Sequence, residues 1–376
     1  MKRRIHGGVL GGVAALALLL GGCGLPGTIS SSGSLPRASA SPTPTPLAPV
    51  RFPQDEAPHH DLTEWWYYTG HLDGRDAAGH DHTYGFELVF FQTLRGAFPP
   101  YYAAHFAVSD ITRGQFHFDQ RAGFEPASVI PPAGSVGGFN VAQDDWHARG
   151  LNGHDRLAAG MDGYAIDLQL DGVTPPVLHA GNGIITFGLA GFSYYYSRPR
   201  MRVAGTLMDH GQAVPVRGQA WMDHQWGNFI TVTGGGWDWF SLQLSDETDA
   251  MLYVIRDSNR QPISLVGTFV TADGVASSIP AADIRIQATG SWTSPATKGD
   301  YPSGWQVTIA SQQLALRLTP LLLDQELVTT QSTGVAYWEG AVAIAGQARG
   351  HRISGEGYVE LTGYAVTPSG TSSGGP

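Results

Sequence analysis

A nine-residue run at positions 221–229, Trp-Met-Asp-His-Gln-Trp-Gly-Asn-Phe, holds an acid, an imidazole and two indoles within the length of one strand. Because extended chain alternates its faces, the odd-numbered and even-numbered side chains of this run point to opposite sides. One side carries Trp221, Asp223 and Gln225, and the other carries Met222, His224 and Trp226. A charge beside large aromatic rings is costly to bury unless it is paired or used. The run predicts a polar site in a hydrophobic pocket; the alternative is a strand whose Asp and His bond neighbouring backbone groups.

The N-terminus, residues 1–23, is predicted to be a lipoprotein signal peptide. Residues 2–4 are Lys-Arg-Arg, and the apolar run 9–20 is too short to span a membrane as a mature helix. The run leads into Leu-Gly-Gly-Cys, which resembles a bacterial lipobox, and Cys23 is the only cysteine, so no intrachain disulfide can form. We expect lipidated Cys23 to anchor the protein to the extracytoplasmic side of a bacterial membrane, periplasmic or cell-surface. The alternative is an ordinary signal peptide that ends near a coincidental cysteine.

Two further segments lack the composition of a folded domain. Residues 24–50 are mostly Ser, Pro, Thr, Gly and Ala, which cannot bury a core and favour extended geometry. We interpret them as a tether between the lipid and the folded part, and residues 368–376 as a disordered tail. The remainder is predicted to divide into a first domain, 51–228, and a second domain, 229–367.

Composition limits the possible classes of protein. The net charge is −10, charged residues make up 14% of the chain, and its lysines are Lys2 and Lys298. A nucleic-acid partner is not expected, because such proteins cluster Lys and Arg. The chain also has 10 Trp, 14 Tyr and 50 Gly, a composition typical of twisted antiparallel sheets with many tight turns.

Strand patterns dominate the folded part. Extended segments are predicted at 83–92, 102–110, 164–170 and 306–318, and one short helix at 280–287. Hairpin turns are predicted at four Asp-Gly dipeptides, which begin at Asp73, Asp162, Asp171 and Asp273. Many strands at short spacing indicate an all-β sandwich or barrel.

A weak internal repeat favours two related β-barrels. Trp65, Tyr67 and His71 match Trp237, Trp239 and Gln243 at a constant offset of 172 positions. Later in each half, Gly218, Trp221 and Asp223 match Gly355, Tyr358 and Glu360. Each half would then open on an aromatic-rich strand and close on a strand that bears an aromatic residue and an acid.

Six motifs together resemble the lipocalin-like family of AttH-type proteins and carotenoid 1,2-hydratases. They lie at 64–72 (EWWYYTGHL), 195–201, 218–224, 236–240, 337–340 and 357–364. The resemblance covers nearly the whole folded part and implies two tandem lipocalin-like antiparallel β-barrels. It places the functional cavity in or between these barrels.

The same resemblance implies an aromatic cavity that binds a large apolar molecule, such as an isoprenoid, a carotenoid or another lipid. Adding water to an unactivated alkene forms a carbocation, so it needs a positioned acid with a raised pKa. We expect Asp223 or Asp238 to donate the proton, His224 to orient or relay it, and aromatic faces to shelter the cation. The residues predicted to bind the ligand are Glu64, Trp66, Trp221, Trp226, Trp237, Trp239 and Tyr253.

Two departures from the family pattern leave the function open. Ile255 stands two positions after Tyr253, where the hydratases resemble one another in an acid, and Gln225 stands where many AttH-type members carry Glu. The match is closer to the AttH-type branch. The protein is therefore either a hydratase-like lyase or isomerase, a non-catalytic carrier or accessory protein of an ABC-type lipid exporter, or a secreted hydrolase.

Several acids have an alternative structural interpretation. Glu64 either faces the cavity or pairs with an arginine such as Arg198 or Arg200. A second group of acids lies close to aromatic residues and consists of Glu87, Glu339 and Glu360. We expect members of this group to form arginine–carboxylate pairs, with Arg256 as one partner.

Other motifs do not define a site. Histidines cluster at 59–61, at 80–82, and at His105 with His117, but sequence cannot show whether ligands converge, so no metal site is assigned. No Gly-x-Ser-x-Gly nucleophile elbow appears in a strand-turn-helix setting, and no glycine-rich phosphate loop followed by a helix is evident. No cofactor is expected.

Overall fold

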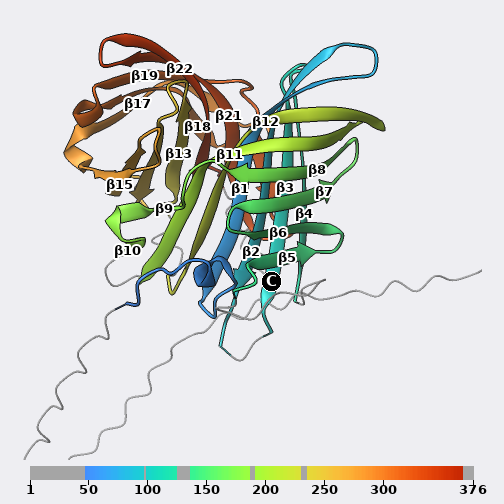
Figure 1. Cartoon of the computed structure of the whole chain (residues 1–376), viewed down its shortest axis with the longest axis horizontal. Helices are drawn as coiled ribbons and strands as arrows, with labels where there is room; N and C mark the ends of the chain where they lie inside the picture. Colours follow the sequence, from blue (N-terminus) through green and yellow to red (C-terminus); the bar gives the residue numbers. More distant parts are fainter. Residues whose placement is uncertain (1–46, 97–98, 125–135, 187–190, 230–234, 367–376) are drawn as a thin grey trace, which may run out of the picture. The chain divides into compact units, whose positions relative to one another are not determined.

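The computed structural model describes residues 47–96, 99–124, 136–186, 191–229 and 235–366. The predicted signal peptide, Cys23, most of the tether and the C-terminal tail lie outside these residues. Strands make up most of the described chain (Figure 1). Among the described residues, no helix has the length and apolar character needed to cross a membrane.

The first sheet is antiparallel and is built from the N-terminal half. Its hydrogen-bonded order is β4-β3-β2-β1-β12-β11-β8-β7-β6-β5, with β9 and β10 also paired to β11. The strands are β1 (Thr63–Arg75), β2 (Asp81–Thr93), β3 (Tyr101–Asp110), β4 (Gln115–Gly123), β5 (Phe139–Gln143), β6 (Trp146–Leu151), β7 (His154–Gly160), β8 (Tyr164–Gly172), β9 (Val177–Leu178), β10 (Ile184–Thr186), β11 (Phe192–Asp209) and β12 (Gln212–Gly227). The two end strands, β4 and β5, contact each other, so the sheet curls almost into a barrel.

The second sheet is antiparallel as well and uses the C-terminal half. Its order is β16-β15-β14-β13-β22-β21-β19-β18-β17, with β20 paired to β21. The strands are β13 (Trp237–Leu244), β14 (Asp249–Arg256), β15 (Pro262–Val270), β16 (Ala276–Ile279), β17 (Ile284–Thr293), β18 (Asp300–Ile309), β19 (Leu314–Pro320), β20 (Glu326–Thr329), β21 (Val335–Ala348) and β22 (His351–Thr362). Short 3-10 turns occur at η1 (Gln54–Glu56), η2 (His179–Gly181), η4 (Ala281–Asp283) and η5 (Ala310–Gln312).

The predicted all-β fold of two tandem, lipocalin-like antiparallel barrels is confirmed. Each curled sheet encloses a core of its own, and a third apolar cluster joins the two sheets. The two repeated strand pairs occupy corresponding places, because β1 pairs with β12 in one sheet and β13 pairs with β22 in the other.

Some local predictions are wrong. The extended segment 306–318 is a hairpin, in which β18 and β19 pair across η5 and Gln313 takes a left-handed φ of 52°. The dipeptide at Asp73 lies inside β1, opposite β2, and the one at Asp171 ends β8. In the segment 280–287, only the 3-10 turn η4 is helical, and β17 follows it directly.

The two sheets approach closely where a glycine removes a side chain. A Cβ atom added at Gly85 of β2 would lie 2.4 Å from the Tyr358 hydroxyl and 2.9 Å from the Ala341 Cβ, both on the second sheet. Nearby, His71 Nε2 donates to the Gly357 carbonyl at 2.9 Å. Because these contacts leave little space, the sheets are held face to face at this level and a hollow between them lies elsewhere.

Candidate functional site

A cavity of ≈ 370 Å³ lies between the two sheets. Its walls come from both halves of the chain. The first sheet contributes Thr63, Trp65, Tyr67, Glu87, Val89, Phe91, His105, Tyr195, Asp223 and Gln225, and the C-terminal half contributes Gly236, Trp237, Trp239, Tyr253, Thr333, Val335, Ala336, Tyr337, Glu360, Thr362 and Gly363. The lining is thus mainly aromatic, with three carboxyl groups among the rings.

The strand pair β1–β12 forms one wall of the cavity. Tyr67 lies opposite Asp223 in the register, and Trp65 lies opposite Gln225. All four side chains line the cavity. The alternation predicted for 221–229 is therefore confirmed, and it also means that His224 points to the other side of β12. Asp223 and His224 do not share a site.

Asp223 is held by three donors. Tyr195 donates its hydroxyl to Oδ2 at 2.5 Å, Trp221 donates Nε1–H to Oδ1 at 2.6 Å, and the Ser197 hydroxyl also donates to Oδ1. Burial raises the pKa of the Asp223 carboxyl to about 7, although these three hydrogen bonds lower it. Asp223 therefore changes charge near neutral pH, and its ionised form has bonds ready to receive it.

Glu87 lies in the cavity wall on β2. Its pKa is raised to about 8, mainly by burial and also by the nearby Glu360, although the hydrogen bond from Tyr337 lowers it. Tyr337 donates its hydroxyl to Oε1 at 2.8 Å, whereas Oε2 is buried and has no hydrogen-bond partner among the described residues. The Tyr337 hydroxyl also lies 2.7 Å from His105 Nδ1, and burial lowers the pKa of His105 to about 3. Glu87 is thus a neutral acid at pH 7, next to a neutral imidazole.

Two further acids belong to the same region. Glu360 accepts a hydrogen bond from Trp237 Nε1 at 2.9 Å, and burial raises its pKa to about 7. Glu339 lies deeper, accepts the Tyr67 hydroxyl at 2.8 Å, and has a pKa well above the usual range because of burial and then the charge of Glu87. The hydrogen bonds to these acids come from Tyr and Trp. The prediction that Glu87, Glu339 and Glu360 form arginine pairs is wrong, and Arg256 instead lies 3.1 Å from Asp238.

Aromatic rings form the rest of the wall. Tyr67 and Trp239 meet edge to face with centroids 5.4 Å apart, and Trp237 meets Tyr253 in the same way at 6.4 Å. The Trp239 Nε1–H donates to the Tyr195 hydroxyl at 2.8 Å, which connects the indole to the Asp223 network. The predicted ligand-binding residues Trp237, Trp239 and Tyr253 therefore lie together around the cavity.

Other predicted site residues lie elsewhere. Glu64, Trp66, His224 and Trp226 face the inside of the first barrel, where Trp66 stacks on the His224 ring at 4.8 Å. Asp238 accepts the Tyr364 hydroxyl at 3.0 Å and pairs with Arg256, away from the cavity lining. Trp221 supports Asp223 from within the layer between the sheets.

The arginine partners foreseen for Glu64 have other carboxylates. Arg198 pairs with Glu56, and Arg200 pairs with Asp249 at 2.7 Å. Glu64 instead contacts two histidines. One of these histidines, His59, belongs to the run at 59–61, which was the sequence signal for this contact.

Sequence reasoning missed Glu87, Tyr195 and Glu360 as cavity residues. A signal existed for Glu360, because the internal repeat aligns it with Asp223. The signal for Glu87 was weaker: it is an acid in the middle of an apolar strand, TYGFELVFFQ. A carboxyl group in such a strand must be desolvated, which raises its pKa unless a cation compensates.

The residues that the structure describes do not form a serine–histidine–aspartate triad around the cavity. His179 Nε2 lies 2.6 Å from the Ser197 hydroxyl, which also contacts Asp223, but the other nitrogen of His179 contacts Thr268 at 2.9 Å. In a catalytic triad the histidine stands between the serine and the acid. Here Ser197 stands between them and does not line the cavity.

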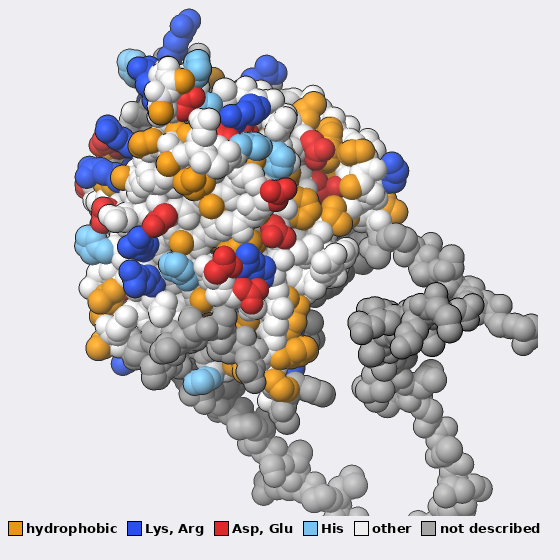
Figure 2. All heavy atoms as spheres, turned by 90° about the vertical axis from the view of Figure 1, so that its right-hand side faces the viewer, with side chains coloured by type: hydrophobic (Ala, Val, Ile, Leu, Met, Phe, Trp, Pro, Cys, Tyr) orange, Lys and Arg blue, Asp and Glu red, His pale blue; other side chains and the backbone are white. Residues whose placement is uncertain are grey.

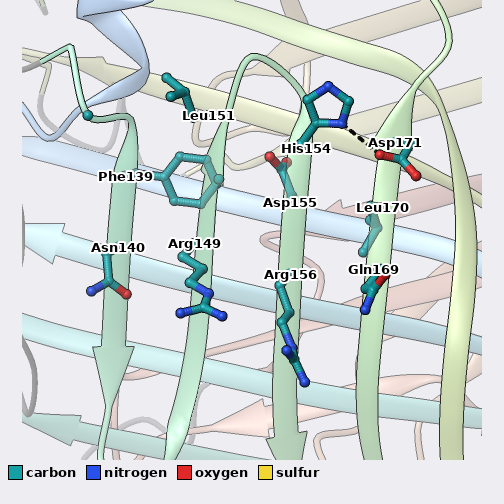
Figure 3. Close-up of a pocket in the computed structure, with 12 residues that line it drawn as sticks. Phe139, Asn140, Arg149, Leu151, His154, Asp155, Arg156, Gln169, Leu170 and Asp171 are labelled. Carbon is teal, nitrogen blue, oxygen red and sulfur yellow. Dashed lines mark hydrogen bonds and ion pairs between the residues drawn. The ribbon is translucent and has the colours of Figure 1, made fainter.

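A second hollow of ≈ 480 Å³ crosses β5 to β8. Acidic and basic side chains are interspersed on the face of the molecule that Figure 2 shows. Figure 3 shows the same mixture in the hollow, with Arg149, Arg156 and Gln169 on neighbouring strands and His154 facing Asp171. Arg156 is paired with Asp167 at 2.7 Å. One acid of the hollow, Asp155, is buried, accepts the Tyr68 hydroxyl at 2.9 Å and has a pKa that burial raises to about 7. The hollow thus has one such acid among exposed charged side chains, whereas the cavity between the sheets combines three with aromatic rings.

Comparisons with known proteins agree with this architecture. The model of the AttH-like family matches residues 43–364. The crystal structure of an AttH protein from Nitrosomonas europaea is similar, with a TM-score of 0.74 and 30% sequence identity. The match covers 85% of this chain and 99% of that one. Kievitone hydratase from Nectria haematococca is 19% identical, with a TM-score of 0.67 over 85% of this chain and 94% of that one, and so shares the fold. No curated protein matches the chain.

Proposed function

Since the chain belongs to the AttH-like family, we propose that it binds an apolar, alkene-bearing molecule between its two sheets and transfers a proton to it. The ligand class is an isoprenoid, a carotenoid or a similar lipid. The reaction is the addition of water to a double bond or its isomerisation. The observation that carries this proposal is an aromatic cavity with three carboxyl groups whose pKa values are about 7, 7 and 8.

The volume and lining suit part of such a ligand. Small-molecule sites usually measure about 300–1,000 Å³ and are mostly apolar with a few convergent polar groups. A cavity of ≈ 370 Å³ is at the small end of this range. It would therefore hold the reacting end of a long chain, and the remainder would extend outside.

The carboxyl groups suit the two proton steps. Glu87 is protonated at neutral pH, and its Oε2, which has no hydrogen-bond partner in the described part of the chain, would give the proton to one alkene carbon and leave a cation on the other carbon. A water molecule adds to that cation and loses a proton to the Asp223 carboxylate. The proton then has to return from Asp223 to Glu87 to complete the cycle. Isomerisation differs only in that Asp223 takes the proton from a neighbouring carbon instead of from water.

The aromatic rings suit the intermediate. Indole and phenol faces attract a cation, and the interaction strengthens when water is excluded. Trp237, Trp239 and Tyr253 surround the cavity and carry no formal charge. An ion pair between the carbocation and the carboxylate left on Glu87 would form in this low-dielectric setting.

One observation favours the non-catalytic alternative. Position 255, where the hydratases carry an acid according to the resemblance, is Ile255, and it is buried in the apolar layer between the sheets. In the carrier role, the acids would hold a polar head group and the protein would deliver its ligand to an ABC-type exporter.

The experiment compares binding with turnover. Wild type, Glu87→Gln and Asp223→Asn would be incubated with acyclic isoprenoid alkenes in H₂¹⁸O, with binding followed by quenching of tryptophan fluorescence. An enzyme incorporates ¹⁸O or shifts the double bond, and either substitution lowers that rate by roughly 100-fold or more while the ligand still binds. A carrier binds in all three forms without any product. Failure of all three forms to bind an apolar alkene refutes both roles.

We further propose that lipid on Cys23 tethers the protein to the extracytoplasmic face of its membrane. The support is the Leu-Gly-Gly-Cys sequence and the Ser/Pro-rich segment after it. In the native host, Cys23→Ala should move the protein from the membrane fraction to the soluble fraction. An unchanged membrane fraction contradicts the anchor.

A further inference from the structure

Three potential metal ligands converge inside the first barrel, on the opposite side of β12 from the cavity. His59 precedes β1, Glu64 lies on β1 and His224 lies on β12. Their ligand atoms all lie within 4.8 Å of one another. His59 Nδ1 and His224 Nε2 are each 2.8 Å from the same oxygen, Glu64 Oε1. Glu64 and His224 are fully buried, and the side chain of His59 is 13% exposed.

Each of these ligands has a second partner that fixes its orientation. His59 Nε2 lies 3.4 Å from Asp55 Oδ1, and His224 Nδ1 lies 3.3 Å from the Tyr196 hydroxyl. The other oxygen of Glu64, Oε2, accepts the His59 backbone N–H at 2.8 Å and Gln92 Nε2 at 3.2 Å. Histidines that bind metals usually donate their remaining ring N–H to a carboxylate or another acceptor in this way.

Aromatic rings hold the two imidazoles from the sides. The His59 ring stacks on Trp226 with centroids 4.0 Å apart and planes at 1°, and the His224 ring stacks on Trp66 at 4.8 Å. Stacked rings resist rotation, so Nδ1 of one histidine and Nε2 of the other stay directed at Glu64. The site is therefore preorganised mainly by the buried residues Tyr196, Gln92, Trp66 and Trp226.

We propose that His59, Glu64 and His224 bind one divalent transition-metal ion of the Zn²⁺ class. Two imidazole nitrogens and one carboxylate oxygen are ligands that suit Zn²⁺ and its first-row neighbours, whereas Mg²⁺ and Ca²⁺ prefer an all-oxygen shell. The carboxylates of Glu64 and Asp55 supply two negative charges to balance the ion. Because the ligand atoms already lie within 4.8 Å of one another, bringing them to the spacing that one ion imposes needs only small side-chain shifts.

Three protein ligands leave at least one position for water or another small ligand, as in catalytic zinc sites. This position would lie on the side of His59, the ligand with exposed surface. The ion would also join the segment before β1 to β1 and β12. Because these two strands carry Tyr67 and Asp223 on their other face, the metal would stabilise a wall of the cavity without touching its contents.

The test measures binding of Zn²⁺ alone. The full chain, stripped with EDTA and dialysed, would be titrated with ZnCl₂ in a calorimeter, with elemental analysis for stoichiometry and Co²⁺ absorption for coordination number. We expect one Zn²⁺ per chain, a Kd on the order of 1 μM or below, and a raised Tm because the ion binds the folded form. Absence of stoichiometric binding overturns the proposal.

Variants separate this site from adventitious binding. Loss of an outer partner usually lowers metal affinity roughly 10–100-fold. His59→Gln removes a direct ligand, the most exposed one, so it should lower the affinity for Zn²⁺ by more than that. Tyr196→Phe keeps all three ligands and should cost about tenfold, so it replaces His59→Gln if that variant does not fold. His80→Gln alters an exposed histidine that contacts Asp76 and should change nothing. Equal affinity in wild type and both site variants, or loss only in His80→Gln, refutes the site.

Discussion

Replacing Asp223 with asparagine tests whether this carboxyl group is protonated when it faces the cavity. The substitution keeps the size of the side chain and one carbonyl oxygen to accept Trp221 and Ser197. The substitution removes the ionisable group, because an amide does not titrate in this pH range. In the folded protein burial raises the pKa of Asp223 from 3.8 to about 7, so the native state holds this proton more tightly than the unfolded chain does.

The sign and size of the effect follow from this raised pKa. For an acid whose pKa is higher in the folded state, stability is fully present below the unfolded pKa and is lost as the pH rises through the folded pKa. A difference of one pKa unit is worth about 1.4 kcal/mol, so most of about 4 kcal/mol is lost between roughly pH 4 and pH 8. From pH 5 to pH 8 the loss is about 3 kcal/mol. Asparagine has no such loss, so its stability relative to wild type should improve by that amount.

The assay is denaturant unfolding of both proteins at pH 5 and pH 8. The control is Asp167→Asn, because Asp167 is exposed, pairs with Arg156 and has a lowered pKa. That variant should show little change between the two pH values, since both lie above the pKa of Asp167 in either state. A stability difference between Asp223→Asn and wild type that is the same at pH 5 and pH 8 would refute the claim that Asp223 is a neutral acid in the fold.

Three further predictions concern the ion pairs, the sheet contact and the cavity acids. Arg200→Gln leaves buried Asp249 without its cation and should lower the free energy of unfolding by about 3–5 kcal/mol. Denaturant unfolding should show a larger decrease at pH 8 than at pH 5, because burial raises the pKa of Asp249 to about 7 and its carboxyl is charged only at the higher pH. Gly85→Val should cost about 1–3 kcal/mol in the same assay, since its side chain would collide with Ala341. Trp237→Phe removes the hydrogen bond that lowers the pKa of Glu360, so ¹³C NMR of the carboxyl carbon should show this pKa raised by about one unit.

The fold was predictable because its determinants are local and repeated. Alternating aromatic residues, glycines at turns and the lack of a helical period all indicate antiparallel strands, and the structure confirms them. The failures are local as well. The segment 306–318 turns through Ala310–Gln312 without a glycine, so the sequence shows no break. The Asp-Gly pair at Asp73 lies within β1 because strand pairing with β2 continues past it to Arg75.

The site was only partly predictable, because its parts come from distant segments. Alternation along 221–229 places Asp223 and His224 on opposite faces, so the expected relay of the proton by His224 is wrong. Nothing in the sequence says which face of β12 meets the second sheet. The face of β12 that meets the second sheet lines the cavity. The opposite face points into the first barrel, and Trp226 and Glu64 therefore lie there. The proximity of Glu87 to Glu360 likewise depends on how two sheets pack, which no single-strand pattern encodes.

The internal repeat explains why acids and indoles meet in one place. Its first part aligns Trp65 with Trp237, and its second part aligns Asp223 with Glu360; all four line the cavity. If two related sheets pack with corresponding strand pairs facing each other, a residue on the inner face of one half is matched by its counterpart on the other. Each half then contributes an indole and a carboxyl group. The repeat therefore accounts for two of the three carboxyl groups of the cavity, Asp223 and Glu360, whereas Glu87, the proton donor of the proposed reaction, lies outside it and reaches the cavity through the packing of β2.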